Sequence, residues 1–118
     1  MKPVHLVLPI RVRTVNEMQY EHWGTKARYA RAERRTTAMA LKPRLPNKLP
    51  KKMSILITRA GPRMLDPDNS IASLKHVIDG VADALGIDDA SPRLDWLYGQ
   101  IVEPEYAVEI TISKGGQS

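Results

Sequence analysis

The chain has 118 residues, no cysteine and a formal net charge of +5, with a pI near 9.7. This length suits one domain, which buries roughly two thirds of the surface that its unfolded chain exposes. The absence of cysteine excludes disulfides, thiolate zinc sites and cysteine nucleophiles. The apolar stretch from Val4 to Ile10 is interrupted by His5 and Pro9 and is too short for a secretion signal or a membrane span, so we expect a cytoplasmic protein without a membrane partner.

Charge is divided unevenly between the two halves of the chain. Residues 1–52 contain 13 Lys and Arg against 3 Glu, whereas residues 53–118 contain 5 Lys and Arg against 10 acidic residues. A basic half of this composition is typical of a surface that contacts phosphates, although an ordinary solvated surface can have the same composition. The acidic half contains the candidate metal ligands.

The first half predicts one strand and one long helix. In chain order we expect a strand over 4–10, a loop over 11–21, a helix over 22–41 and a basic, proline-rich loop over 42–52. The helix is rich in Ala and Arg and has no internal proline. Trp23, near its start, is expected to anchor the core rather than to stack on nucleic-acid bases.

The second half predicts the rest of the sheet. We expect a strand over 53–58, a helix from Asp68 or Asn69 to Leu85, a closing hairpin of strands 94–102 and 107–113, and a flexible tail over 114–118. The apolar stripe of that helix is Ile71, Leu74, Ile78, Val81 and Leu85. These elements predict a single α+β domain, residues 1–118, in which about four strands form a mixed sheet and two main helices pack on it.

Basic residues on the predicted helix and loops form a candidate DNA-binding surface. Arg28, Arg31 and Arg35 fall at i, i+3 and i+7, so their guanidinium groups line one helix face. We call these three residues the basic stripe. Lys51 and Lys52 in the proline-rich loop, and Arg63 before the acidic segment, are candidates for further phosphate contacts.

The run Asp66-Pro67-Asp68 is the candidate metal site. Residues two apart in an extended segment point to the same side, so both carboxylates can face one cation. Mg²⁺ prefers one or two protein carboxylates and keeps its other positions for water and substrate phosphate. The same two aspartates also suit a turn and a helix N-cap.

The helix that follows this run adds further candidates. At about 100° per residue along this helix, Lys75 and Asp79 lie on the same helix edge as the Asp68 carboxylate. Lys75 and Asp79 also suit an exposed i, i+4 ion pair. Asp88 and Asp89 follow the helix, and a loop that folds back can supply a third carboxylate.

The acidic motif resembles a known family. The resemblance extends over most of the chain in the same order and is carried by Leu65-Asp66-Pro67-Asp68-Asn69, the Lys75 to Asp79 spacing, Ala84-Leu85-Gly86-Ile87-Asp88-Asp89, Asn16 and His22-Trp23. These features are similar to those of the RusA family of Holliday-junction resolvases, which phages and prophages often carry. The resemblance implies a small homodimeric α/β nuclease that nicks branched DNA in recombination and repair and uses Mg²⁺, for which Mn²⁺ can substitute. It implies that Asp66, Asp68 and Asp89 hold the metal and that Lys75 is essential for catalysis.

Two positions depart from the family pattern. Lys75 is seven residues after Asp68 rather than four, and Leu65 stands where a basic residue precedes the first aspartate, so Arg63 is a second candidate for the catalytic cation. Whether Asp89 joins the Asp66 and Asp68 of its own subunit stays open. Two other functions are consistent with the sequence: a metal-dependent nuclease for flaps or forks, and a DNA-binding protein without catalytic activity.

Overall fold

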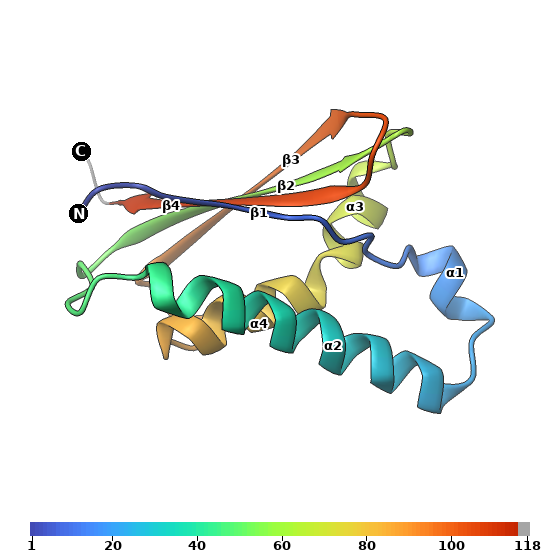
Figure 1. Ribbon diagram of the computed structural model, residues 1–118, viewed down its shortest axis with the longest axis horizontal. Helices are drawn as coiled ribbons and strands as arrows, with labels where there is room; N and C mark the ends of the chain where they lie inside the picture. Colours follow the sequence, from blue (N-terminus) through green and yellow to red (C-terminus); the bar gives the residue numbers. More distant parts are fainter. Residues whose placement is uncertain (116–118) are drawn as a thin grey trace.

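The structure is a computed structural model that describes residues 1–115. Its elements in chain order are β1 (Val4–Leu8), α1 (Val15–Gln19), α2 (Trp23–Leu41), a 3-10 turn (Lys42–Arg44), β2 (Met53–Gly61), α3 (Pro67–Ser73), α4 (Lys75–Leu85), β3 (Leu94–Val102) and β4 (Ala107–Lys114). The strands form one mixed sheet in the order β1-β4-β2-β3. Figure 1 shows α2 and α4 on the same side of this sheet. The α+β domain with a four-stranded mixed sheet is therefore confirmed.

The expected hairpin of the last two strands is wrong. β4 pairs antiparallel with β1 and β2, whereas β3 pairs only with β2, in parallel. The two strand segments were predicted correctly, but β2 lies between them. Parallel strands need a long crossover, and α3 with α4 provides it. The connection from β3 to β4 passes the end of β2, where the Glu103 N–H donates to the Gly61 carbonyl at 2.9 Å.

The core lies between the sheet and the two long helices. Alternate residues of β2 and β4 face the helices and are fully buried, including Met53, Ile55, Ile57, Val108, Ile110 and Ile112. Helix α4 contributes Val77, Val81 and Leu85. Of the predicted stripe, Leu74, Val81 and Leu85 are buried, but Ile71 is exposed and Val77 takes a core position that the stripe did not include.

Helices α2 and α4 approach closely at Gly80. A Cβ atom at this position would lie 2.5 Å from the Arg34 carbonyl oxygen and 2.7 Å from the Thr37 Cβ, so only glycine allows this crossing. Beside it, the Arg34 guanidinium donates two hydrogen bonds to Asp83, at 2.6 and 2.8 Å. The pair fixes the basic helix to the helix that follows the acidic motif.

Helix α1 lies where the sequence predicted a loop over 11–21. Thr14 caps it, because its hydroxyl accepts from the Glu17 N–H at 3.2 Å while the Glu17 carboxylate reaches back to the Thr14 N–H. This is a capping box, and the pattern Thr14-x-x-Glu17 is its sequence signature. The helix has only five residues and no apolar stripe, so the search for periodic apolar residues missed it.

The predicted helix after the acidic motif is two helices. Asp66, not Asp68 or Asn69, is the N-cap of α3, and the chain breaks at Leu74 (φ −93°, ψ 1°) before α4 begins at Lys75. A helical phase carried from Asp68 to Lys75 and Asp79 therefore does not hold across the break. Leu74 is fully buried, which ties the break to the core.

Three smaller expectations also change. Residues 42–44 of the predicted loop form a 3-10 turn. Lys114, predicted in the tail, ends β4, and the Gly115 N–H donates to the Lys52 carbonyl at 2.9 Å. The rest of the predicted tail, 116–118, lies outside the described residues. Over residues 1–115, no helix combines the length and hydropathy that crossing a membrane requires.

Candidate nucleic-acid interface and acidic site

The basic stripe lies on the exposed face of α2. Arg28, Arg31 and Arg35 are all exposed and line one groove of about 860 Å³ along the helix. In the part of the chain that the structure describes, none of the three forms an ion pair. Arg34 lies next to them but is already engaged by Asp83. Its hydrogen bonds keep the pKa of the Asp83 carboxyl below the usual value. Arg35 donates one hydrogen bond to the Met39 sulfur at 3.4 Å, and all three guanidinium groups of the basic stripe remain exposed to phosphates.

The other predicted basic contacts do not lie together. Lys51 and Lys52 precede the start of β2, whereas Arg63 follows its end. A nine-residue strand separates them by about 30 Å. The Arg93 side chain donates to the Lys51 carbonyl oxygen at 3.0 Å, and this hydrogen bond holds the loop before β2 in place. One phosphate backbone would have to pass both ends of the sheet to contact all three side chains.

Two polar side chains hold the loop that leads to Asp66. Arg59 of β2 is only 4% exposed and donates to the Arg63 carbonyl at 2.8 Å. Gln100, its neighbour on β3, accepts from the Leu65 N–H at 2.9 Å and donates to the Leu65 carbonyl at 2.8 Å. The loop is therefore attached to two adjacent strands, which fixes where the acidic motif begins. Arg59 and Gln100 were not among the predicted site residues.

Asp66 and Asp68 lie at the start of α3 and are exposed. One Asp66 oxygen, Oδ2, accepts from the Asn69 N–H at 3.4 Å, so this aspartate acts as the helix cap. Asp68 is in the first turn, where a negative charge stabilises the helix. Pro67 at the first helical position suits this start. The capping alternative therefore holds for Asp66, and a carboxylate has further oxygen lone pairs that a cation can use.

Asp89 lies near two aromatic residues of β3, Trp96 and Tyr98. The Trp96 indole N–H donates to the Asp89 carbonyl at 2.9 Å. Burial, and then the nearby Asp89 carboxylate, raise the pKa of Tyr98 above its ordinary value. Tyr98 also lines a hollow of about 210 Å³ with Pro67 and Ser70 of α3. Tyr98 is thus near both segments that carry the predicted metal ligands.

The three predicted carboxylates do not form one closed set within the described chain. Among residues 1–115, no group of three or more His, Cys, Asp or Glu side chains is arranged to hold a metal ion. Asp89 also lines a second hollow, of about 440 Å³, together with Asp79, Asp83 and Asp88. What fits Mg²⁺ is the chemistry of the donors: two exposed carboxylates on either side of Pro67, with open space for water and a phosphate.

Lys75 is the first residue of α4 and is exposed. The ion pair that the sequence allowed between Lys75 and Asp79 is not formed among the described residues; Asp79 instead lies 3.9 Å from the His76 ring nitrogen Nδ1. Burial is the largest influence on His76 and lowers its pKa, against the attraction of Asp79. The Lys75 ammonium is therefore available for a ligand, as is the exposed side chain of Arg63.

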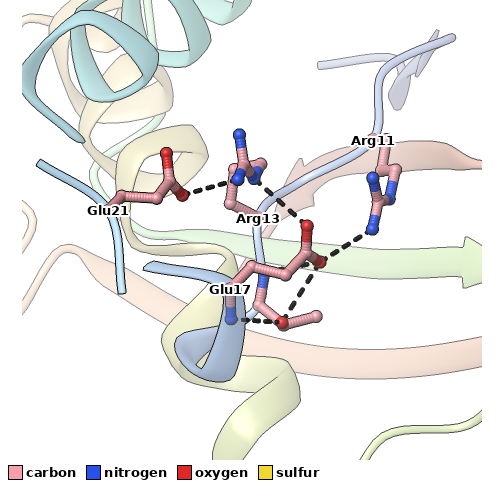
Figure 2. Close-up of polar contacts among 5 residues, drawn as sticks. Arg11, Arg13, Glu17 and Glu21 are labelled. Carbon is pink, nitrogen blue, oxygen red and sulfur yellow. Dashed lines mark hydrogen bonds and ion pairs between the residues drawn. The ribbon is translucent and has the colours of Figure 1, made fainter. Parts of the chain in front are cut away.

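A cluster around Arg13 is a further polar feature that the sequence analysis did not predict. Figure 2 shows Arg13 between Glu17, at 3.2 Å, and Glu21, at 2.6 Å, while Arg11 reaches Glu17 at 2.8 Å. Burial opposes ionisation of Glu17, but the bonds from Thr14 and the charges of the two arginines hold its pKa below the ordinary value. The cluster fastens α1 and the start of the following turn to the loop after β1.

Glu33 of α2 is the most unusual acid near this cluster. It is only 8% exposed, and its Oε1 has no hydrogen-bond partner among residues 1–115. Burial raises the pKa of Glu33 to about 7, against the opposing attraction of Arg13. Because Arg13 is already engaged by Glu17 and Glu21, Glu33 is the acid of this region whose charged form is least well compensated. Its position in a run of Ala and Arg gave no sign of burial.

Comparison with protein-family models and with curated proteins finds no match for this chain. The resemblance to the RusA family is therefore based on the motif residues alone.

Proposed function

We propose that this protein is a Mg²⁺-dependent endodeoxyribonuclease that acts on Holliday junctions or other branched DNA as a homodimer. The observation that carries the proposal is that Tyr98 lines a hollow with Pro67 and Ser70, the neighbours of Asp66 and Asp68 in α3, while the Asp89 carboxylate is near enough to Tyr98 to raise its pKa. These are the three aspartates to which the RusA resemblance assigns the metal. The exposed basic stripe supports binding of a polyanion by the same chain.

Each part of the site has a role in this proposal. Asp66, Asp68 and Asp89 would hold Mg²⁺, and the bound ion would supply an activated water and offset charge on the scissile phosphate. Lys75 or Arg63 would contact the phosphate as negative charge develops on it. The basic stripe would hold a DNA arm through its backbone, which binds without reading the sequence.

A non-catalytic DNA-binding protein is the second candidate. It is favoured by the capping role of Asp66 and by the lack of a three-ligand group among the described residues. The two candidates differ in their need for metal. A binding protein would bind a junction equally well with and without Mg²⁺ and would never nick it.

Cleavage of a synthetic four-way junction, with and without Mg²⁺, tests the proposal. We expect paired nicks that require the metal, and parallel reactions with flaps and forks establish the preferred structure. Terbium luminescence adds a readout that does not depend on cleavage, because Trp96 bonds to the Asp89 backbone and can sensitise a bound Tb³⁺. Trp96→Phe should reduce the signal to the part that Tyr98 sensitises, whereas Trp23→Phe should leave it unchanged. If neither nicks nor luminescence are observed, the nuclease proposal is wrong and the non-catalytic DNA-binding protein remains as the candidate function.

The basic stripe gives a separate prediction about affinity. Replacement of Arg28, Arg31 and Arg35 by glutamine should weaken binding to all DNA structures and reduce the slope of log K against log salt by up to about 0.9 per lost phosphate contact. Filter binding or anisotropy over a range of salt concentrations measures this. Arg34→Gln is the matched control, because its guanidinium already bonds to Asp83. An unchanged slope in the triple variant would mean that DNA binds elsewhere.

A further inference from the structure

Two large aromatic side chains project from the turn between α1 and α2. Tyr20 is 86% exposed and Trp23 is 77% exposed. The sequence predicted Trp23 in the core, and this prediction is wrong, because Trp23 begins α2 before the helix reaches the sheet (Figure 1). Single apolar residues on a surface are common, but two large exposed aromatic rings three residues apart in one turn suit a contact with a partner.

Local contacts hold this tip in place without help from a partner. The His22 ring caps α2 by accepting from the Gly24 N–H at 3.1 Å, and its centre lies 5.4 Å from the centre of the Trp23 ring. Tyr20 ends α1, where its backbone N–H donates to Met18. The next residue, Glu21, bonds to Arg13 at 2.6 Å. A partner would therefore meet rings that are already positioned, which lowers the entropy cost of binding.

The charge around the tip favours a polyanion. Its two nearest acids, Glu17 and Glu21, are engaged by Arg11 and Arg13. The helix then continues with Lys26 and with Arg28 and Arg31 of the basic stripe, all exposed and outside every ion pair of the described chain. Exposed aromatic rings followed by unpaired cations are the combination that binds single-stranded nucleic acid.

We propose that Trp23 and Tyr20 stack on base faces exposed at the branch point of the DNA, while the basic stripe holds the adjoining duplex arm. The bases of an intact duplex already stack on one another, so these rings gain a contact only where the stack is interrupted. From Trp23 to Arg35 the helix extends about 18 Å, which matches about five base pairs of the arm. The inference rests on the proposed function, because that proposal identifies the ligand as branched DNA. It does not require that the protein cleaves this DNA.

Tryptophan fluorescence tests this directly. Trp96→Phe leaves Trp23 as the only tryptophan, and EDTA prevents any metal-dependent cleavage during the titration. We expect quenching of Trp23 by a four-way junction and by a single-stranded oligonucleotide, but little by a blunt duplex of equal length. Trp23→Ala should weaken binding to the junction about tenfold and leave duplex affinity unchanged. Trp23→Phe should recover part of the loss, since a smaller ring still stacks.

Val7→Ala is the matched control, because Val7 is also a large exposed apolar side chain but has no ring and lies on β1, outside the basic stripe. It should bind every DNA like the parent protein. An equal loss of junction and duplex affinity in Trp23→Ala would overturn the inference, and so would the absence of quenching by any DNA, which would leave the tip for a protein partner. Selective quenching by a junction that is never nicked in Mg²⁺ would sustain the inference while refuting the nuclease.

Discussion

Asp66→Asn is expected to lower the rate of junction cleavage at least about 1,000-fold, or about 4 kcal/mol of activation free energy, while the protein stays folded and binds the junction. Asparagine removes the charge that Mg²⁺ requires but remains a good helix N-cap, so the hydrogen bond to the Asn69 N–H can persist. The variant therefore separates the metal-binding role of this residue from its capping role. Single-turnover cleavage at saturating DNA, together with thermal unfolding, measures the two.

Two further variants make this test specific. Asp68→Asn and Asp89→Asn should give the same loss of cleavage with intact binding, because the proposed site uses all three carboxylates. Asp79→Asn is the matched control: Asp79 lines the neighbouring acidic hollow with Asp89 but lies outside the proposed ligand set. If Asp66→Asn cleaves normally and Asp79→Asn is inactive, the metal belongs to that hollow and the assignment from the motif is wrong.

Glu33→Gln should stabilise the protein at pH 8 by up to about 3 kcal/mol. Burial raises the pKa of Glu33 from an ordinary value of 4.5 to about 7, so the folded protein holds a proton that the unfolded chain releases. The stability linked to this proton is complete below pH 4.5 and is lost as the pH rises through 7. Above that pH the folded protein contains a buried carboxylate, which glutamine replaces without charge.

Urea denaturation at pH 5 and pH 8 measures this effect. The difference in unfolding free energy between Glu33→Gln and the parent should grow between the two pH values. The other titratable groups are present in both proteins, so their contributions cancel in the difference. Glu103→Gln, at an exposed position, should show no such growth. An equal difference at both pH values would mean that Glu33 ionises normally in the folded protein.

Most of the secondary structure could be predicted from local patterns, because the pattern of each segment is strong. Alternating apolar residues predicted β2, and the Ala- and Arg-rich run bounded by His22 predicted α2 almost to the residue. The pairing of the strands could not be predicted in the same way. Alternation indicates that 94–102 and 107–113 are strands, but it contains no information on which neighbour each strand takes. The nearest partner in sequence was assumed, and β2 lies between them instead.

The candidate site was predictable in composition but not in geometry. The motif identified Asp66, Asp68 and Asp89, yet the break at Leu74 follows no proline or glycine and depends on tertiary packing. Residues that position the acidic loop were also missed, because a polar side chain such as Gln100 acquires its role only when β3 lies beside β2. Trp23 was misplaced for a related reason: aromatic character favours burial on average, but burial depends on where the helix begins relative to the sheet.

The position of β4 in the sheet also determines when folding can be completed. β4 is the last strand in the chain, yet it pairs with both β1 and β2, and Val4 meets Ile112 across almost the whole chain. Contacts of such separation form late, because closing a long loop costs entropy before any contact compensates for it. While the chain leaves the ribosome, the edge of β2 that pairs with β4 therefore has no partner until residues 107–114 emerge. That interval is when the nascent protein is most exposed to aggregation.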